Sequence, residues 1–282
     1  LPMIFPGDAA EETEGLSESA EDIHKMQEKY SGRIPGANLH YKDAVELVTE
    51  GASEVCLVVE QDVMACRSRN VVARIEGTDK KDEILTITAH YDSVPEGPGA
   101  YDNMAGAAII MELCRYFQQY RPRRTMEFVW FGAEEKGLLG SRDYIRVHES
   151  ELGAHRFNMN VDLAGQLIGG NVLGVTGEAS VCDKLLEIAD GAGIGASVKN
   201  QIWGSDSNSF AWKGIPAMTL NRDGFGMHTR YDTIDLLSAW SLERSAILLG
   251  CIADALGNAE VFPFERKMPE KFIGELDEYM CR

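Results

Sequence analysis

The chain has 282 residues, of which 44% are hydrophobic, and its 45 acidic and 27 basic side chains give a net charge of −18. This length and apolar content fit one large α/β domain better than two small domains. The acidic balance argues against a nucleic-acid partner or an anionic membrane surface, because both need a basic footprint on the protein.

The sequence contains no run of about 18 apolar residues, so we expect no membrane-spanning segment. The apolar opening Leu1–Phe5 is too short for a signal peptide, and the lack of an initiator methionine indicates a processed or trimmed start. We therefore expect a cytoplasmic protein, with secretion as the alternative if Leu1 is a mature terminus. Six widely spaced cysteines without a CxxC pair predict buried or free thiols.

The first predicted elements are a helix and the beginning of a sheet. Tyr41–Glu50 carries its apolar residues at helical spacing. Two alternating segments, 54–63 and 68–77, predict a hairpin that leads into a sheet. Lys80-Lys81 is expected in the turn before a buried strand, which Ile84–Thr88 begins.

Strands and helices alternate through the remainder of the chain. Apolar strands are expected over Thr125–Gly132, Phe157–Leu163, Asn171–Val175 and Ile215–Asn221. Helices are expected over Met104–Tyr120, Leu138–His148, Ser180–Ala189, Gly204–Trp212 (capped by Ser205 or Asp206), Trp240–Leu256 and after Pro263. This recurrence predicts a three-layer α/β/α sandwich around a mostly parallel, mixed central sheet.

Candidate metal-binding side chains follow the predicted strands, where open α/β sheets place their ligands. They are His90, Asp102, Glu135, Asp162 and His228, with Asp92 and Glu134 beside them. Two imidazoles and three carboxylates suit Zn²⁺, Co²⁺ or Mn²⁺. Five ligands are too many for one catalytic zinc, but two ions can share them if one carboxylate bridges.

Each of these residues also has a plain structural interpretation. Asp92 could cap a loop, Glu134 could be a surface carboxylate and His228 could be a hydrogen-bonded loop histidine. The adjacent Glu134 and Glu135 favour a metal site, because they follow a strongly apolar strand and burying either carboxylate is costly without a cation.

Taken together, the segments TAHYDS, Asp102-Asn103, GAEEKGLLGS, NVDLAG and MHTRYDT resemble metallopeptidase family 28, the co-catalytic dinuclear zinc aminopeptidases. The resemblance runs from about Ser68 to Leu256 and keeps the order of the family's motifs. It implies the zinc-exopeptidase form of the α/β/α fold. We expect a single domain over 1–282, in which the polar, acidic residues 1–40 stand where longer members carry an inserted lid.

The resemblance also implies a role for each candidate. Asp102 would bridge two zinc ions, and its bond to Asn103 would be cis. His90 and Asp162 would complete one metal site, and Glu135 and His228 the other. Glu134 would be the general base, Asp92 would orient His90, and Asp232 would support His228. Met227 stands where some members carry a tyrosine that assists the oxyanion, which leaves that role unassigned.

The expected function is hydrolysis of the N-terminal peptide bond of peptides with a free N-terminus. Four residues in flanking loops could line an apolar pocket for the first side chain or simply pack those loops: Trp203, Phe210, Phe225 and Met227. The alternatives are a one-zinc glutaminyl cyclase-like acyltransferase, a carboxypeptidase that uses Arg222 or Arg230, and a catalytically silent binding module.

Overall fold

A computed structural model describes residues 39–54, 56, 58 and 66–280. The chain divides into two compact units, and Ser68–Glu134 with Leu138–Cys281 forms the larger one. In the unit built on residues 1–67, the described secondary structure is helix α3, Tyr41–Thr49, as predicted. Residues 1–38 lie outside the described part of the chain, so the expected acidic segment is not tested.

The larger unit is built on a seven-stranded mixed sheet in the order β1-β3-β2-β4-β7-β5-β6. Its strands are β1 Val71–Ile75, β2 Lys80–His90, β3 Arg124–Phe131, β4 His155–Val161, β5 Asn171–Thr176, β6 Ala196–Asn200 and β7 Ala217–Arg222. The four central strands β3, β2, β4 and β7 are parallel, whereas β1 and β5 each run antiparallel to the central strand beside them. The carboxyl ends of the central strands therefore meet at one edge of the sheet.

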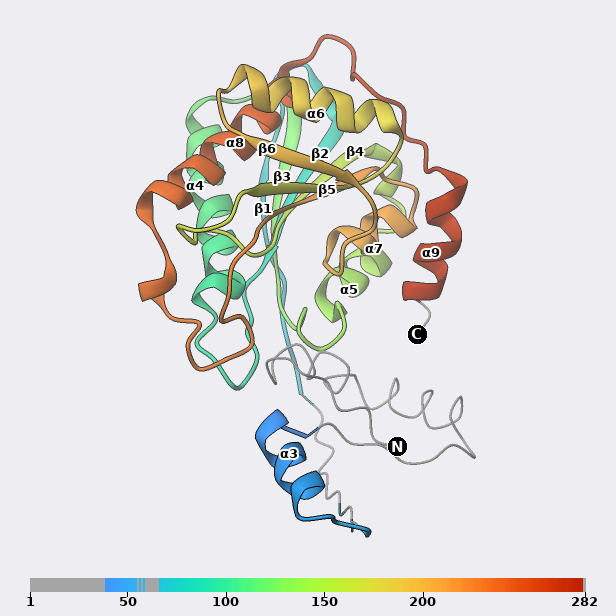
Figure 1. Cartoon of the computed structure of the whole chain (residues 1–282). Helices are drawn as coiled ribbons and strands as arrows, with labels where there is room; N and C mark the ends of the chain where they lie inside the picture. The colour runs from blue at the N-terminus through green and yellow to red at the C-terminus, as the bar shows by residue number, and fades with distance from the viewer. Residues whose placement is uncertain (1–38, 55, 57, 59–65, 281–282) are drawn as a thin grey trace. The chain divides into compact units, whose positions relative to one another are not determined.

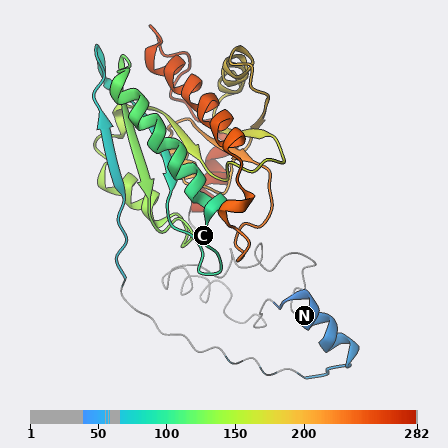
Figure 2. The ribbon, with the colours of Figure 1, turned by 90° about the vertical axis from the view of Figure 1, so that its left-hand side faces the viewer.

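Helices cover both faces of this sheet (Figures 1 and 2). One layer contains α4 Ala105–Gln119, α6 Ala179–Gly191 and α8 Ala239–Asn258. The other contains α5 Leu139–Val147, α7 Ser207–Trp212 and α9 Glu270–Met280. The observed architecture is the predicted three-layer sandwich.

The two faces of the sheet differ in chemistry because successive side chains of a strand point to opposite sides. On β2, Leu85 and Ile87 join the main hydrophobic core with α4, α6 and α8. Thr86, Thr88 and His90 alternate with them and are also buried. The layer between the sheet and α7 is thus partly polar, and it lies directly beneath the edge where the central strands end.

Three local expectations differ from the structure. The edge strand β6 escapes sequence analysis because its exposed, alternating residues are few and polar. Lys80 and Lys81 begin β2 and do not form a turn before it. The second arm of the expected hairpin gives β1, which pairs with β3, while most of the first arm, 54–63, lies outside the described residues.

Among the described helices, none combines the length and apolar character that crossing a membrane requires.

Close packing at the start of α4 requires glycine. A Cβ built on Gly106 would lie 2.4 Å from Asn103 Oδ1 and 2.8 Å from the Val161 carbonyl oxygen. Asn103 in turn donates its side-chain amide to Val161 O and accepts the N–H of Gly106. This helix start is therefore locked against the end of β4.

We expect Gly106→Ala to lower the free energy of unfolding by about 1–3 kcal/mol, because the added methyl group must displace backbone and a buried amide. Urea unfolding measures this change. Gly274→Ala is the matched control: Gly274 lies in helix α9, where an added Cβ would meet no atom within 4 Å, so this variant should be neutral or stabilising. Equal stability of the two variants would contradict the packing argument.

Candidate metal centre

The candidate residues reach one edge of the sheet from four parallel strands. His90 is the last residue of β2, and Asp162 follows β4 directly. Glu134 and Glu135 stand in the turn after β3, and His228 lies in the loop after β7. Parallel strands place their carboxyl ends side by side, which is why residues so distant in sequence come together.

The first cluster of donor atoms comprises His90, Asp102 and Asp162. His90 Nε2 lies 3.1 Å from Asp102 Oδ1 and 3.3 Å from Asp162 Oδ1. One donor atom from each residue falls within 4.8 Å of the other two, and all three residues are buried. These spacings allow one ion to contact all three side chains.

The second cluster shares Asp102 with the first. Asp102 Oδ2 lies 3.0 Å from His228 Nε2, and Asp102, Glu135 and His228 offer donor atoms within 4.8 Å of one another. Asp102 therefore presents one oxygen to each cluster, which is the arrangement that a bridging carboxylate requires. Mixed imidazole and carboxylate donors suit zinc, so the side chains present fit two such ions.

Asp102 is held in place from the loop that contains His228. The carboxylate of Asp232 accepts the backbone N–H groups of Tyr101 at 2.6 Å and of Asp102 at 3.0 Å. We expected Asp232 to support His228, which stays a prediction, and the structure shows its carboxylate bound to the Asp102 turn. The peptide bond between Asp102 and Asn103 is cis, as predicted.

Asp92 connects His90 with Glu134. Its carbonyl oxygen lies 3.1 Å from His90 Nδ1, and its Oδ1 accepts the backbone N–H of Glu134 at 3.0 Å. The first contact directs the opposite ring nitrogen, Nε2, toward the carboxylates. Glu134 Oε2 lies 4.0 Å from His90 Nε2, so this carboxylate stands at the margin of the first cluster.

The electrostatics of the cluster favour a cation. Burial lowers the pKa of His90, but the carboxylates of Glu134 and Asp162 and the hydrogen bond to Asp102 outweigh burial and hold that pKa well above its usual value. Burial raises the pKa of Asp102, yet hydrogen bonds from His228 and His90 hold it well below its usual range. Surroundings that stabilise a protonated imidazole also stabilise a metal ion, since both carry positive charge.

Ser205 contacts the cluster in a way that sequence analysis did not anticipate. Its hydroxyl donates to Asp162 Oδ2 at 2.5 Å, whereas we expected Ser205 or Asp206 to cap α7. Asp206 occupies the N-cap position without a side-chain capping bond, and burial raises its pKa to about 7. The local sequence around Ser205 gives no signal for this contact, because the contact joins segments that are distant in sequence.

The four residues expected to line a substrate pocket have different surroundings. Phe210 is fully buried and its ring packs against Phe131 and Tyr144, so it is a core residue, and of the two alternatives it follows packing and not the pocket. Phe225 is exposed and Met227 is half-buried in the loop that carries His228. The Trp203 ring lies over Gly174 of β5. Pocket roles for these three remain predictions.

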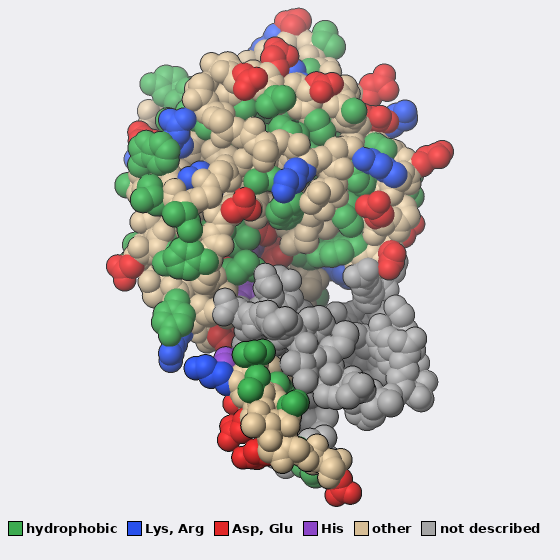
Figure 3. Space-filling view, viewed as in Figure 1, with side chains coloured by type: hydrophobic (Ala, Val, Ile, Leu, Met, Phe, Trp, Pro, Cys, Tyr) green, Lys and Arg blue, Asp and Glu red, His purple; other side chains and the backbone are tan. Residues whose placement is uncertain are grey.

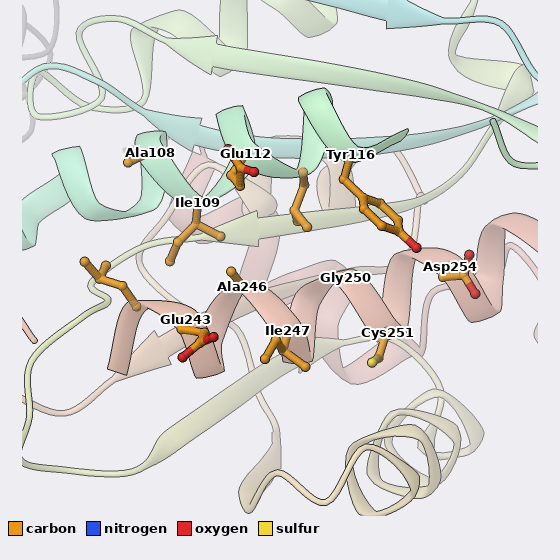
Figure 4. Close-up of a pocket in the computed structure, with 12 residues that line it drawn as sticks. Ala108, Ile109, Glu112, Tyr116, Glu243, Ala246, Ile247, Gly250, Cys251 and Asp254 are labelled. Atoms are coloured by element: carbon orange, nitrogen blue, oxygen red, sulfur yellow. The ribbon is translucent and has the colours of Figure 1, made fainter. Parts of the chain in front are cut away.

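A separate groove of about 630 Å³ runs between α4 and α8 (Figure 4). Ile109, Tyr116, Ala246 and Ile247 are among its lining residues. Hydrophobic side chains gather on the left of the face seen in Figure 3, over these two helices. None of the candidate metal-binding residues lines the groove, so we do not assign the chemistry to it.

Comparison with known proteins agrees with this geometry. The model of Peptidase family M28 matches residues 70–250, which is more than half of the chain. Aminopeptidase YwaD of Bacillus subtilis is 30% identical over 161 residues, covering 57% of this chain and 32% of that protein. Carboxypeptidase Q of Rattus norvegicus is 26% identical over 241 residues, covering 81% of this chain and 51% of that protein.

The structure of BSAP, a zinc aminopeptidase from Bacillus subtilis, superimposes with a TM-score of 0.62 at 26% identity, covering 70% of this chain and 53% of that one. The chain thus spans about half the length of these relatives, or less. The family match includes both donor clusters and every central strand, and the chain belongs to Peptidase family M28.

Proposed function

We propose that this chain is a zinc-dependent aminopeptidase that binds two zinc ions and hydrolyses the first peptide bond of peptides with a free N-terminus. The observation that supports it most is the shared carboxylate, because Asp102 directs one oxygen toward each of two donor clusters. His90 and Asp162 would hold one ion, and Glu135 and His228 the other. Co²⁺ or Mn²⁺ could replace zinc at the same donors.

Ions held by these residues would supply positive charge that acidifies water and polarises the scissile carbonyl. Glu134 then accepts the proton of the attacking water and returns it to the leaving amine. Asp92 holds the backbone of Glu134 through its N–H, which keeps this carboxylate beside the cluster during both transfers. Tight positioning of this kind lets one carboxylate act first as base and then as acid.

The charge balance supports recognition of a free amino group. Asp92, Asp102, Glu134, Glu135 and Asp162 bring five carboxylates to the site, whereas two divalent ions bring four positive charges. The remaining negative charge favours a cationic N-terminus next to the scissile bond.

A carboxypeptidase would instead need a cation for the substrate carboxylate. Arg222 is buried, and its guanidinium donates to Gln166 O, Leu167 O and Asn171 Oδ1, so its donors are used within the protein. Arg230 is exposed and stacks on Tyr231. Two donor clusters also argue against a cyclase with a single zinc, and the full set of candidate residues argues against a silent binding module.

Metal analysis of the purified chain should find about two zinc ions per molecule, because the two clusters share Asp102. A chelator should abolish hydrolysis of aminoacyl anilides, and zinc should restore it. One ion per chain at saturation would contradict the paired site.

Glu134→Gln should lower kcat about 10²- to 10⁴-fold, because glutamine cannot accept the proton of the attacking water. Zinc content should stay unchanged, since Glu134 is not among the proposed ligands. Glu243→Gln is the control and should retain full activity, because Glu243 lies on helix α8 in the groove that none of the candidate metal-binding residues lines. Full activity of the Glu134→Gln variant would show that another group is the base.

Substrate specificity separates the exopeptidase classes. A peptide with a free N-terminus should be cleaved at its first bond, while the same peptide carrying an N-acetyl group should be cleaved far more slowly, because acetylation removes the positive charge. Mass spectrometry of the products identifies the bond. Loss of the C-terminal residue from the acetylated peptide would favour a carboxypeptidase.

A further inference from the structure

Buried polar side chains form a continuous chain beneath Asp162, on the sheet face that packs against α7. Its members are Asn158 and Asn160 of β4, Thr88 of β2 and Ser205, which precedes α7. All four are fully buried. Polar groups at such positions are costly unless each is paired, so their hydrogen bonds decide what they do.

Four hydrogen bonds join these side chains in sequence. Asn158 Nδ2 donates to Thr88 Oγ1 at 3.1 Å, and Thr88 Oγ1 donates to Asn160 Oδ1 at 2.8 Å. Asn160 Nδ2 donates to Ser205 Oγ at 2.7 Å, and Ser205 Oγ donates to Asp162 Oδ2 at 2.5 Å. Every donor therefore points toward Asp162.

The donor-to-acceptor direction of these hydrogen bonds follows from the last acceptor, Asp162. An ionised carboxylate can only accept, so Ser205 must give its single proton to Asp162. Ser205 can then only accept from Asn160, which must present its NH₂ group there and its oxygen to Thr88. Thr88 must donate to that oxygen and accept from Asn158. The charge on Asp162 thus sets the orientation of both amides, and reversing either one would place two donors or two acceptors face to face.

We propose that Asn160 is a positioning residue for Asp162, acting through Ser205. Because Ser205 occupies Asp162 Oδ2, the other oxygen, Oδ1, is left to face His90 Nε2 at 3.3 Å. Asn160 holds the Ser205 hydroxyl so that its proton points to Asp162 Oδ2, which would leave Oδ1 as the oxygen available to the metal ion. This inference rests on the metal centre of the proposed function.

Asn160→Asp tests this series of hydrogen bonds with almost no change in the shape of the side chain. The new carboxylate cannot donate to Ser205 and competes with Asp162 for the serine proton. We expect the affinity for one of the two zinc ions to fall about 10- to 100-fold, the range typical of residues that orient a ligand. Chelator competition measures both affinities, and the absorption spectrum of the Co²⁺-loaded chain reports the altered coordination.

Thr88→Val is a second variant, for use if the added charge prevents folding. It removes the hydroxyl that orients Asn160 and should weaken the same zinc ion to a smaller extent. Thr219→Val is the control, because Thr219 lies on strand β7, which pairs with β4, is as buried as Thr88 and pairs with Ser207 at 2.7 Å. It should bind both zinc ions as the unaltered chain does.

The unfolding midpoint in chelator should drop in both valine variants and further in Thr88→Val, since Thr88 takes part in two buried hydrogen bonds and Thr219 in one. If these hydrogen-bonded side chains had a purely structural role, the zinc affinity would be the same in both variants. If the Asn160→Asp and Thr88→Val proteins bind both ions with affinities within twofold of the unaltered protein, the inference about Asn160 is wrong, while the proposed metal centre stands. An unaltered chain that binds no zinc would overturn the proposed metal centre and this inference with it.

Discussion

The structure depends on compensating the electrostatic cost of holding several carboxylates together at a buried edge of a sheet. Asp102, Glu135 and Asp162 are all buried, and Glu134 stands beside them. Carboxylates this close repel one another and lose hydration, so they persist only where positive charge or hydrogen-bond donors compensate. In the described residues, the imidazoles of His90 and His228, the hydroxyl of Ser205 and the backbone of the Asp102 turn share that task with the proposed ions.

The fold meets this cost by using the two sheet faces differently. The face under α4 and α8 is apolar, and its main core supplies the hydrophobic stabilisation of the larger unit. The face under α7 is partly polar, with Thr88, Asn160 and Ser205 linked beneath Asp162. A polar layer contributes little hydrophobic stabilisation, but it specifies one orientation for each side chain that it contains. The candidate site thus stands on the polar layer, which we propose orients its ligands, and the opposite layer stabilises the domain.

Sequence patterns predicted those elements whose signals are local. The apolar run of β3 and the amphipathic helices α4 and α8 were located to within two residues at each end, whereas β2 begins four residues before the expected strand. The short edge strand β6 was missed because it buries little apolar surface. Its two faces therefore differ too little in polarity to indicate a strand. The sequence left open whether Phe210 lines a pocket or packs, because an aromatic residue in a small helix has the same pattern whether it faces a core or a cavity.

The sequence by itself determined the fold class and the identity of the side chains that could hold metal, because strand periodicity and ligand chemistry are both properties of single segments. Only the tertiary structure decided how those side chains meet. It gave the geometry by which Asp102 is shared between two clusters, an arrangement that the family resemblance implied, and it revealed the support that Asp232 gives to the Asp102 turn and the hydrogen bonds that run from Asn158 to Asp162. These contacts join residues from different strands, and their geometry exists only once the parallel strands are aligned in register.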